Sequence, residues 1–205
     1  MAAFGISASL FAMWLYMTLY LQQILGLSAI EAGLVYLPGT LLNFVVAGAT
    51  GQVGQKVSPR VLVAGGLALI GAGQALLTVV GADSPWWLFL PGLLVAMFGT
   101  GMFNPAVSQV ALSAAPPEQS GLAAGVNDMF RQAGIAVGTA ALGALVPAGA
   151  ALGGGSPQAY VDGLHDALWV GAVLALAAAA ASALLIRERR PRGAQAPGDV
   201  ALEPA

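Results

Sequence analysis

Residues Ser120–Gly143 read SGLAAGVNDMFRQAGIAVGTAALG, a stretch apolar enough to lie in a membrane that still carries four strongly polar side chains. These four are Asn127, Asp128, Arg131 and Gln132. An ionisable side chain at the centre of a membrane helix costs about 2.5–3.5 kcal/mol on insertion scales, so it normally faces protein or a water-filled cavity. The stretch therefore predicts a membrane helix with one face turned toward the interior of a helical bundle.

The composition of the whole chain agrees with a membrane protein. Hydrophobic residues make up 58% of it and charged residues 8%, and the mean hydropathy is +0.82. Soluble domains carry about 25% charged residues. The net charge of −2, without a basic run in the membrane part, gives no reason to expect a nucleic-acid partner.

The residue inventory argues against an enzyme or a metal protein. Cysteine is absent, which excludes disulfides and thiolate metal sites, and the presence of a single histidine argues against a histidine-based metal centre. That histidine, His165, is expected at the edge of a loop as a solvated surface residue, away from the depth that an intramembrane protease would need. We therefore expect no catalytic residues, no metal site and no cofactor.

Six stretches have about the 20 apolar residues that a membrane-spanning helix requires. They lie at residues 4–25, 33–54, 61–80, 86–112, 121–147 and 165–186. The fold class is thus an all-α membrane protein with one unit of six helices, residues 1–186. The glycine-rich residues 149–164 are predicted to form a loop, and the polar residues 187–205 a disordered cytoplasmic tail.

The basic residues predict the orientation of this unit. With six spans, Lys56, Arg60 and the four arginines of the tail fall on one side of the membrane. The loops on the opposite side contain the acidic residues Glu31, Asp83, Asp162 and Asp166 and no Lys or Arg. By the positive-inside rule, both termini are expected in the cytoplasm, with the chain in the cell membrane. Trp86 and Trp87 are expected to be interfacial anchors.

Polar side chains divide the predicted helices into two groups. The third and sixth are nearly free of them and are suited to facing lipid, with Gln74 as the strongly polar residue of the third. The other four are expected to line a cavity, because polar groups are costly in hydrocarbon. The candidate cavity residues are Tyr16, Tyr20, Gln22, Asn43, Asn104 and Gln109. The alternative for each is an interhelical hydrogen bond, worth about 0.6 kcal/mol.

Asp128 and Arg131 stand three residues apart, so they share a helix face and can pair. In one interpretation, Asp128 gains and loses a proton during coupling, or Arg131 meets a substrate or an opposing domain. In the other, a neutralised pair holds the packing or a gate near the cytoplasmic side. We favour structure and gating over direct proton transfer, with Asn127 and Gln132 in the same group.

Glycines at helical spacing predict close helix packing, at Gly48/Gly51/Gly54, Gly121/Gly125 and Gly134/Gly138. Two short segments of the chain also resemble each other weakly. LSAIEAGL at residues 27–34 follows the first span, and LSAAPPEQSGL at residues 112–122 follows the fourth. If helices 1–3 and 4–6 are related triplets, they have opposite topology, which is the 3+3 inverted repeat of many secondary transporters.

Three strings carry a resemblance to a known family. They are YLQQILGLSAIEAGLVYLP at 20–38, GQVGQKVSPR at 51–60 and GTGMFNPAVSQVALSAAPPEQSGLAAGVNDMFRQAGIAVGTA at 99–140. With them the chain resembles the C-terminal six-span half of a major facilitator superfamily transporter, more narrowly a fourteen-span drug/proton antiporter of the EmrB/QacA type. The loop at 51–60 is similar to the superfamily's cytoplasmic motif. It keeps Gly51, Lys56 and Arg60, but Gln55 stands where the acid would be.

The resemblance implies a multidrug efflux function, in which amphipathic organic compounds are exported by alternating access at the expense of a proton gradient. It also implies that the first, second, fourth and fifth helices line the cavity, in agreement with the polarity of the helices. The expected partners are the lipid bilayer, a small amphipathic substrate and the missing N-terminal half, in the same or a separate chain. The alternatives are a self-pairing half, a truncated or split half without transport activity, and a membrane assembly component.

Overall fold

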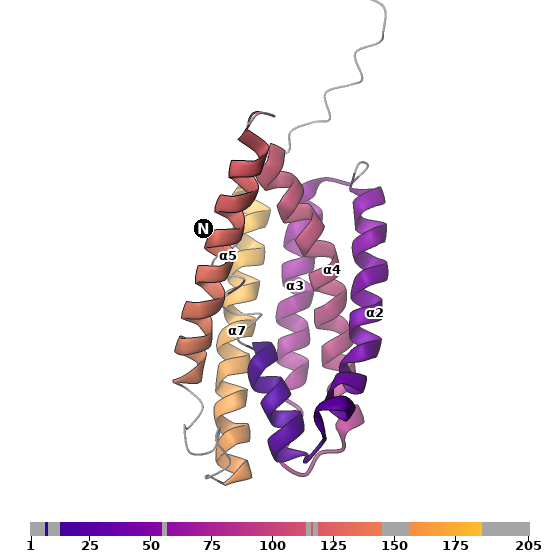
Figure 1. Ribbon diagram of the computed structural model, residues 1–205, viewed down its shortest axis with the longest axis vertical. Helices are drawn as coiled ribbons and strands as arrows, with labels where there is room; N and C mark the ends of the chain where they lie inside the picture. The colour runs from indigo at the N-terminus through magenta and orange to yellow at the C-terminus, as the bar shows by residue number, and fades with distance from the viewer. Residues whose placement is uncertain are drawn as a thin grey trace, which may run out of the picture.

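The computed structural model describes residues 7, 13–54, 57–113, 116, 119–144 and 156–185. Within these residues every regular element is a helix, and the long helices run side by side as a bundle (Figure 1). Residues 13–19 are helical and continue into a π-helical turn. The elements in chain order are η1 (Tyr20–Ile24), α2 (Ala29–Val53), α3 (Pro59–Leu77), the 3₁₀-helix η2 (Trp86–Phe89), α4 (Leu90–Ser113), α5 (Ser120–Gly143) and α7 (Pro157–Leu185).

Four described helices are long and apolar enough to cross a membrane. They occupy Ala29–Val53, Pro59–Leu77, Trp86–Val110 and Pro157–Leu184. α5 is of similar length, at 24 residues, but its polar cluster makes it less apolar. The first predicted span, residues 4–25, lies partly outside the described residues. The all-helical membrane fold is therefore confirmed, while six spans and the 3+3 repeat stay predictions.

α2 and α7 begin four or more residues earlier than the predicted spans, and capping residues explain both. α2 begins at Ala29 because Ser28 and Glu31 form a capping box, in which the Ser28 hydroxyl and Glu31 carboxylate satisfy each other's backbone N–H groups. α7 begins at Pro157, with the Ser156 hydroxyl accepting a hydrogen bond from the Ala159 N–H at 3.2 Å. The predicted loop at 149–164 is therefore wrong from residue 157 onward. The predicted tail, residues 187–205, lies outside the described residues.

α3 is the centre of the packing, since it contacts both α4 and α7 extensively, while α2 packs on the other side of α4. The α3–α4 contact depends on glycine. A Cβ added at Gly99 would lie 2.5 Å from the Gly66 carbonyl oxygen, and one at Gly73 would lie 2.5 Å from the Ala96 nitrogen. Small residues let the two backbones approach this closely, which is how membrane helices pack without a hydrophobic driving force.

The glycines that spacing predicted to pack closely are not the ones that form the α3–α4 contact. A Cβ at Gly48, Gly51, Gly121 or Gly125 would meet nothing within 4 Å. Only Gly54 among the glycines predicted on α2 has close neighbours, its own Thr50 carbonyl and the Gln109 side chain. Spacing marks small-residue faces correctly but does not show which of them are covered within this chain. Within the described bundle these four glycines therefore make no close helix contact, whereas Gly134 and Gly138 of α5 are buried.

The lipid-facing assignment of α3 holds for only one side of the helix. α3 is the most deeply buried of the four apolar spans, and its polar residue Gln74 is 2% exposed. Its outward side carries exposed apolar residues, among them Val61 and Leu76. α7 likewise exposes a run of apolar side chains that includes Val173 and Leu174. The third helix is therefore more enclosed than its polarity predicts, because α4 and α7 cover it from two sides.

Hydrogen bonds tie three segments together at the end of the bundle where α3 finishes. The Tyr20 hydroxyl donates to the Gly81 carbonyl at 2.7 Å, and the Tyr160 hydroxyl donates to the Tyr16 carbonyl at 2.6 Å. His165 Nε2 lies 2.7 Å from the Val80 carbonyl oxygen. The expectation of a solvated His165 is therefore wrong, because the early start of α7 places this residue inside a helix against the α3–η2 connection.

Candidate functional site

Asp128 and Arg131 form the predicted ion pair on α5. Arg131 Nη2 donates to Asp128 Oδ1 at 2.7 Å, and the side chains are 42% and 53% exposed for arginine and aspartate. The Arg131 Nε is buried and has no hydrogen-bond partner among the described residues. The pair thus offers one satisfied charge contact and one unused donor. The roles predicted for these residues stay predictions.

α5 holds this pair at the edge of the bundle. It lies along one side of the molecule (Figure 1), and its main neighbour among the other elements is α4, which precedes it in the chain. The Tyr16 hydroxyl adds one contact, a 2.8 Å hydrogen bond to the Thr139 carbonyl. Of the two remaining predicted residues, Asn127 is half-buried and Gln132 is exposed. Most of α5, including the ion pair, therefore remains uncovered by the described chain.

Three of the six predicted cavity residues use their side chains in hydrogen bonds within the bundle. Tyr16, Tyr20 and Asn43 use their side chains in hydrogen bonds to backbone carbonyls of other segments, with Asn43 Nδ2 reaching the Met97 carbonyl at 3.1 Å. These bonds match the structural alternative considered for them. Gln22 is half-buried, and Asn104 and Gln109 are exposed on α4. A cavity role for the last three stays a prediction.

The predicted cytoplasmic motif is divided between two helix ends. Gly51 lies in the last turn of α2 and Arg60 in the first turn of α3, and both are half-buried. Lys56 lies outside the described residues, as does Gln55.

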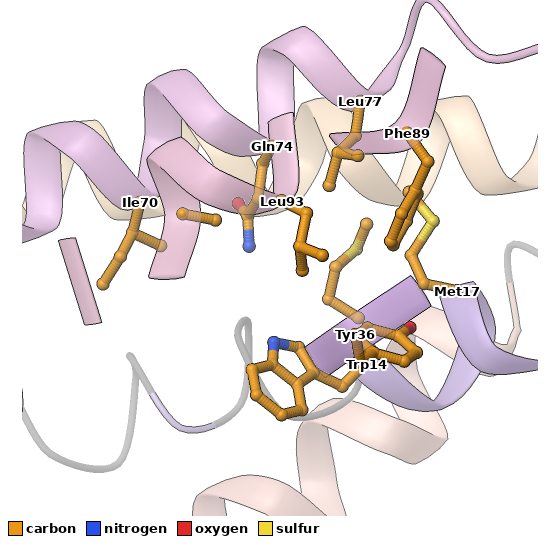
Figure 2. A pocket seen from close by; sticks show the side chains of 10 residues that line it. Trp14, Met17, Tyr36, Ile70, Gln74, Leu77, Phe89 and Leu93 are labelled. Atoms are coloured by element: carbon orange, nitrogen blue, oxygen red, sulfur yellow. The ribbon is translucent and has the colours of Figure 1, made fainter. Parts of the chain in front are cut away.

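A small cavity inside the bundle, about 20 Å³ in volume, was not predicted. Trp14, Tyr36 and Phe89 form an aromatic cluster around it, with ring centroids 5.9 Å apart for Trp14–Tyr36 and 5.6 Å for Tyr36–Phe89. The amide of Gln74 points into the same space (Figure 2). This volume holds about one water molecule, so the cavity is a packing feature and not a substrate site as it stands.

A signal for this cluster exists in the sequence. Residues 13–20 read MWLYMTLY, an aromatic and methionine-rich run, and Gln74 is the strongly polar residue of its helix. Because the third helix was predicted to face lipid, Gln74 was not expected to join this cluster. Among the described residues, no group of three or more His, Asp or Glu is arranged to hold a metal ion.

Comparison with known proteins identifies the family and a set of relatives. The model of the Major Facilitator Superfamily matches residues 1–139. The puromycin resistance protein pur8 of Streptomyces alboniger is 30% identical over 96% of this chain and 41% of its own length. The cephamycin export protein CmcT of Amycolatopsis lactamdurans is 32% identical over 87% of this chain and 36% of its own.

The methylenomycin A resistance protein of Streptomyces coelicolor is 29% identical over 71% of this chain and 31% of its own length. The chain thus spans about a third to two fifths of the length of these curated relatives.

Proposed function

Since the chain belongs to the Major Facilitator Superfamily, we propose that it is the C-terminal, six-span half of a fourteen-span drug/proton antiporter of the EmrB/QacA type. Its relatives are resistance and export proteins for puromycin, cephamycin and methylenomycin A. The proposed cargo is accordingly a small amphipathic organic compound. The proposed path out of the cell is alternating access between this half and a second one.

The exposed ion pair on α5 is the observation that carries the proposal. Asp128 and Arg131 remain about half exposed although they lie on a helix of a membrane protein. Charges on a membrane helix are costly in hydrocarbon, so they normally face protein or a watery cavity. The described chain provides neither cover, which supports a second half whose helices close a cavity over this face of α5.

The open glycines support the same arrangement. α2 is the least buried of the four apolar spans. Gly48 and Gly51 on α2, and Gly121 and Gly125 on α5, face open space. Small-residue faces allow close approach of a neighbouring helix, so α2 and α5 are suited to contact the second half.

In this proposal both termini lie in the cytoplasm, as the basic residues predict, and transport uses the proton gradient without a bound cofactor. Arg131 then acts as a gate or packing residue at the cavity, with its unused Nε available to the other half. Asp128 is its partner, and whether it also carries a proton distinguishes two versions of the mechanism. A split half without transport of its own, or a membrane assembly component, is the alternative function.

Arg131→Ala in the complete transporter is expected to lower ethidium efflux about tenfold, because it removes the positive charge and leaves Asp128 unpaired on the cavity face. Efflux is measured from cells by dye fluorescence. Arg131→Lys is the matched control, because it keeps the charge and should retain most of the activity. Unchanged efflux in Arg131→Ala would remove the role assigned to this residue, although not the membership of the family.

A further inference from the structure

A groove of about 320 Å³ lies where α2 begins and η2 leads into α4. We call it the α2–η2 groove. Leu34 and Pro38 of α2 line it on one side, and Trp86 and Leu90 on the other. Glu31, in the first turn of α2, is the one charged residue among those that line it. Its volume falls at the lower end of the range of small-molecule sites, which are mostly apolar with a few polar groups.

The groove presents large apolar side chains to its open space. Leu34 is 59% exposed and Trp86 is 48% exposed. The neighbouring Trp87 is similarly exposed but does not line the groove. An interfacial anchoring role explains either tryptophan, but only Trp86 adds an indole to a concave surface. This difference makes the two residues a matched pair for experiments.

One oxygen of the Glu31 carboxylate is available to contact a ligand. Its Oε2 accepts two hydrogen bonds from Ser28, one from the backbone N–H, which belongs to the capping box, and one from the hydroxyl, each at 2.8 Å. Its other oxygen accepts no hydrogen bond from the described residues. One oxygen therefore fixes the start of α2, and the other is free to meet a ligand at the groove.

The charge at this end of the bundle favours a cation. Asp83 lies in the α3–η2 connection, and Asp162 and Asp166 lie in the first part of α7. The Lys and Arg residues within the described ranges are Arg60 and Arg131, and neither belongs to the segments that form this end. Acidic residues without basic ones create a negative local potential that concentrates cations.

We propose that the α2–η2 groove binds an amphipathic organic cation, with its charge paired to Glu31, its charged or aromatic part against Trp86, and its apolar body against Leu34, Pro38 and Leu90. An indole face attracts a cation through its ring quadrupole, and a carboxylate adds a charge-assisted contact. The groove includes no residue of α5. Binding here can therefore fail while efflux through the proposed cavity persists, and the two proposals fail separately.

Tetraphenylphosphonium binding to the chain in nanodiscs of phosphatidylglycerol tests this site, with empty nanodiscs as the blank. Glu31→Gln should weaken it about tenfold. Glutamine at this position can still complete the capping box, so the variant removes the charge while keeping the start of α2. Trp86→Ala should weaken binding to a similar extent. The control Trp87→Ala should change the affinity less than twofold, because this residue does not line the groove.

Tetraphenylborate has the same shape and the opposite charge, so Glu31→Gln should leave its binding unchanged or improve it. Equal losses for both ions would show that the variant damages the groove and not a cation contact, and would overturn the proposal. So would unaltered tetraphenylphosphonium binding in both Glu31→Gln and Trp86→Ala. Loss of binding when phosphatidylethanolamine is added would assign the groove to a lipid headgroup instead of a free cation.

Discussion

Replacing Gly99 with valine is expected to destabilise the helical bundle by about 3 kcal/mol or more, enough to prevent stable folding of a marginal unit. A Cβ at this position would lie 2.5 Å from the Gly66 carbonyl oxygen and 2.8 Å from the Ile70 nitrogen. Both are backbone atoms, so they cannot move aside as a flexible side chain would. The α3–α4 contact, the largest in the bundle, would have to separate.

Gly48→Val is the matched control for this variant, because a Cβ there meets nothing within 4 Å. Thermal unfolding of the two purified variants in detergent, followed by circular dichroism, gives the comparison. We expect a strongly lowered midpoint or no cooperative transition for Gly99→Val, and a midpoint within a few degrees of the parent for Gly48→Val. Equal stability of the two variants would contradict the close α3–α4 contact.

Gly125→Val is expected to produce the opposite pattern, with normal stability of the chain alone and loss of drug efflux in the complete transporter. Gly125 faces open space on α5, one turn before Asp128. If α5 meets the second half, a branched side chain at this position separates the helices that glycine allows to approach. Ethidium efflux and thermal unfolding, measured on the same variant, distinguish docking from folding.

Gly125→Ala serves as the graded control, because it adds one methyl group and should retain partial efflux. Normal efflux with Gly125→Val would mean that this face of α5 does not pack against another helix. A lowered stability of the isolated chain would mean that the face is covered within the chain itself. Either result would weaken the assignment of α5 to the interface between two halves.

The presence and approximate positions of the long helices could be predicted from the sequence, because each apolar run is long and uniform. The starts of α2 and α7 could not be obtained from hydropathy, because Ser28–Glu31 and Ser156–Pro157 set them through capping. The pairing of Asp128 with Arg131 was predictable, since it depends only on spacing along one helix.

Contacts between helices were less predictable, because spacing within one helix does not identify its neighbour. Gly48 and Gly66 look alike in the sequence, yet only Gly66 meets another backbone. Tyr16 and Asn43 are polar residues in apolar spans, which suits a cavity and an interhelical bond equally well. The structure shows the bond in both cases. Gln74 was expected on a lipid-facing helix because that helix has few polar residues, yet its side chain is buried and lines the small cavity.

We propose that this chain is one half of a drug exporter and needs a second half to transport. Ethidium efflux from cells producing the chain alone, and from cells producing it together with the N-terminal half, tests the claim most directly. We expect efflux only when both halves are present, with loss of activity in Gly125→Val. Efflux by the chain alone at the rate of the complete transporter would contradict it.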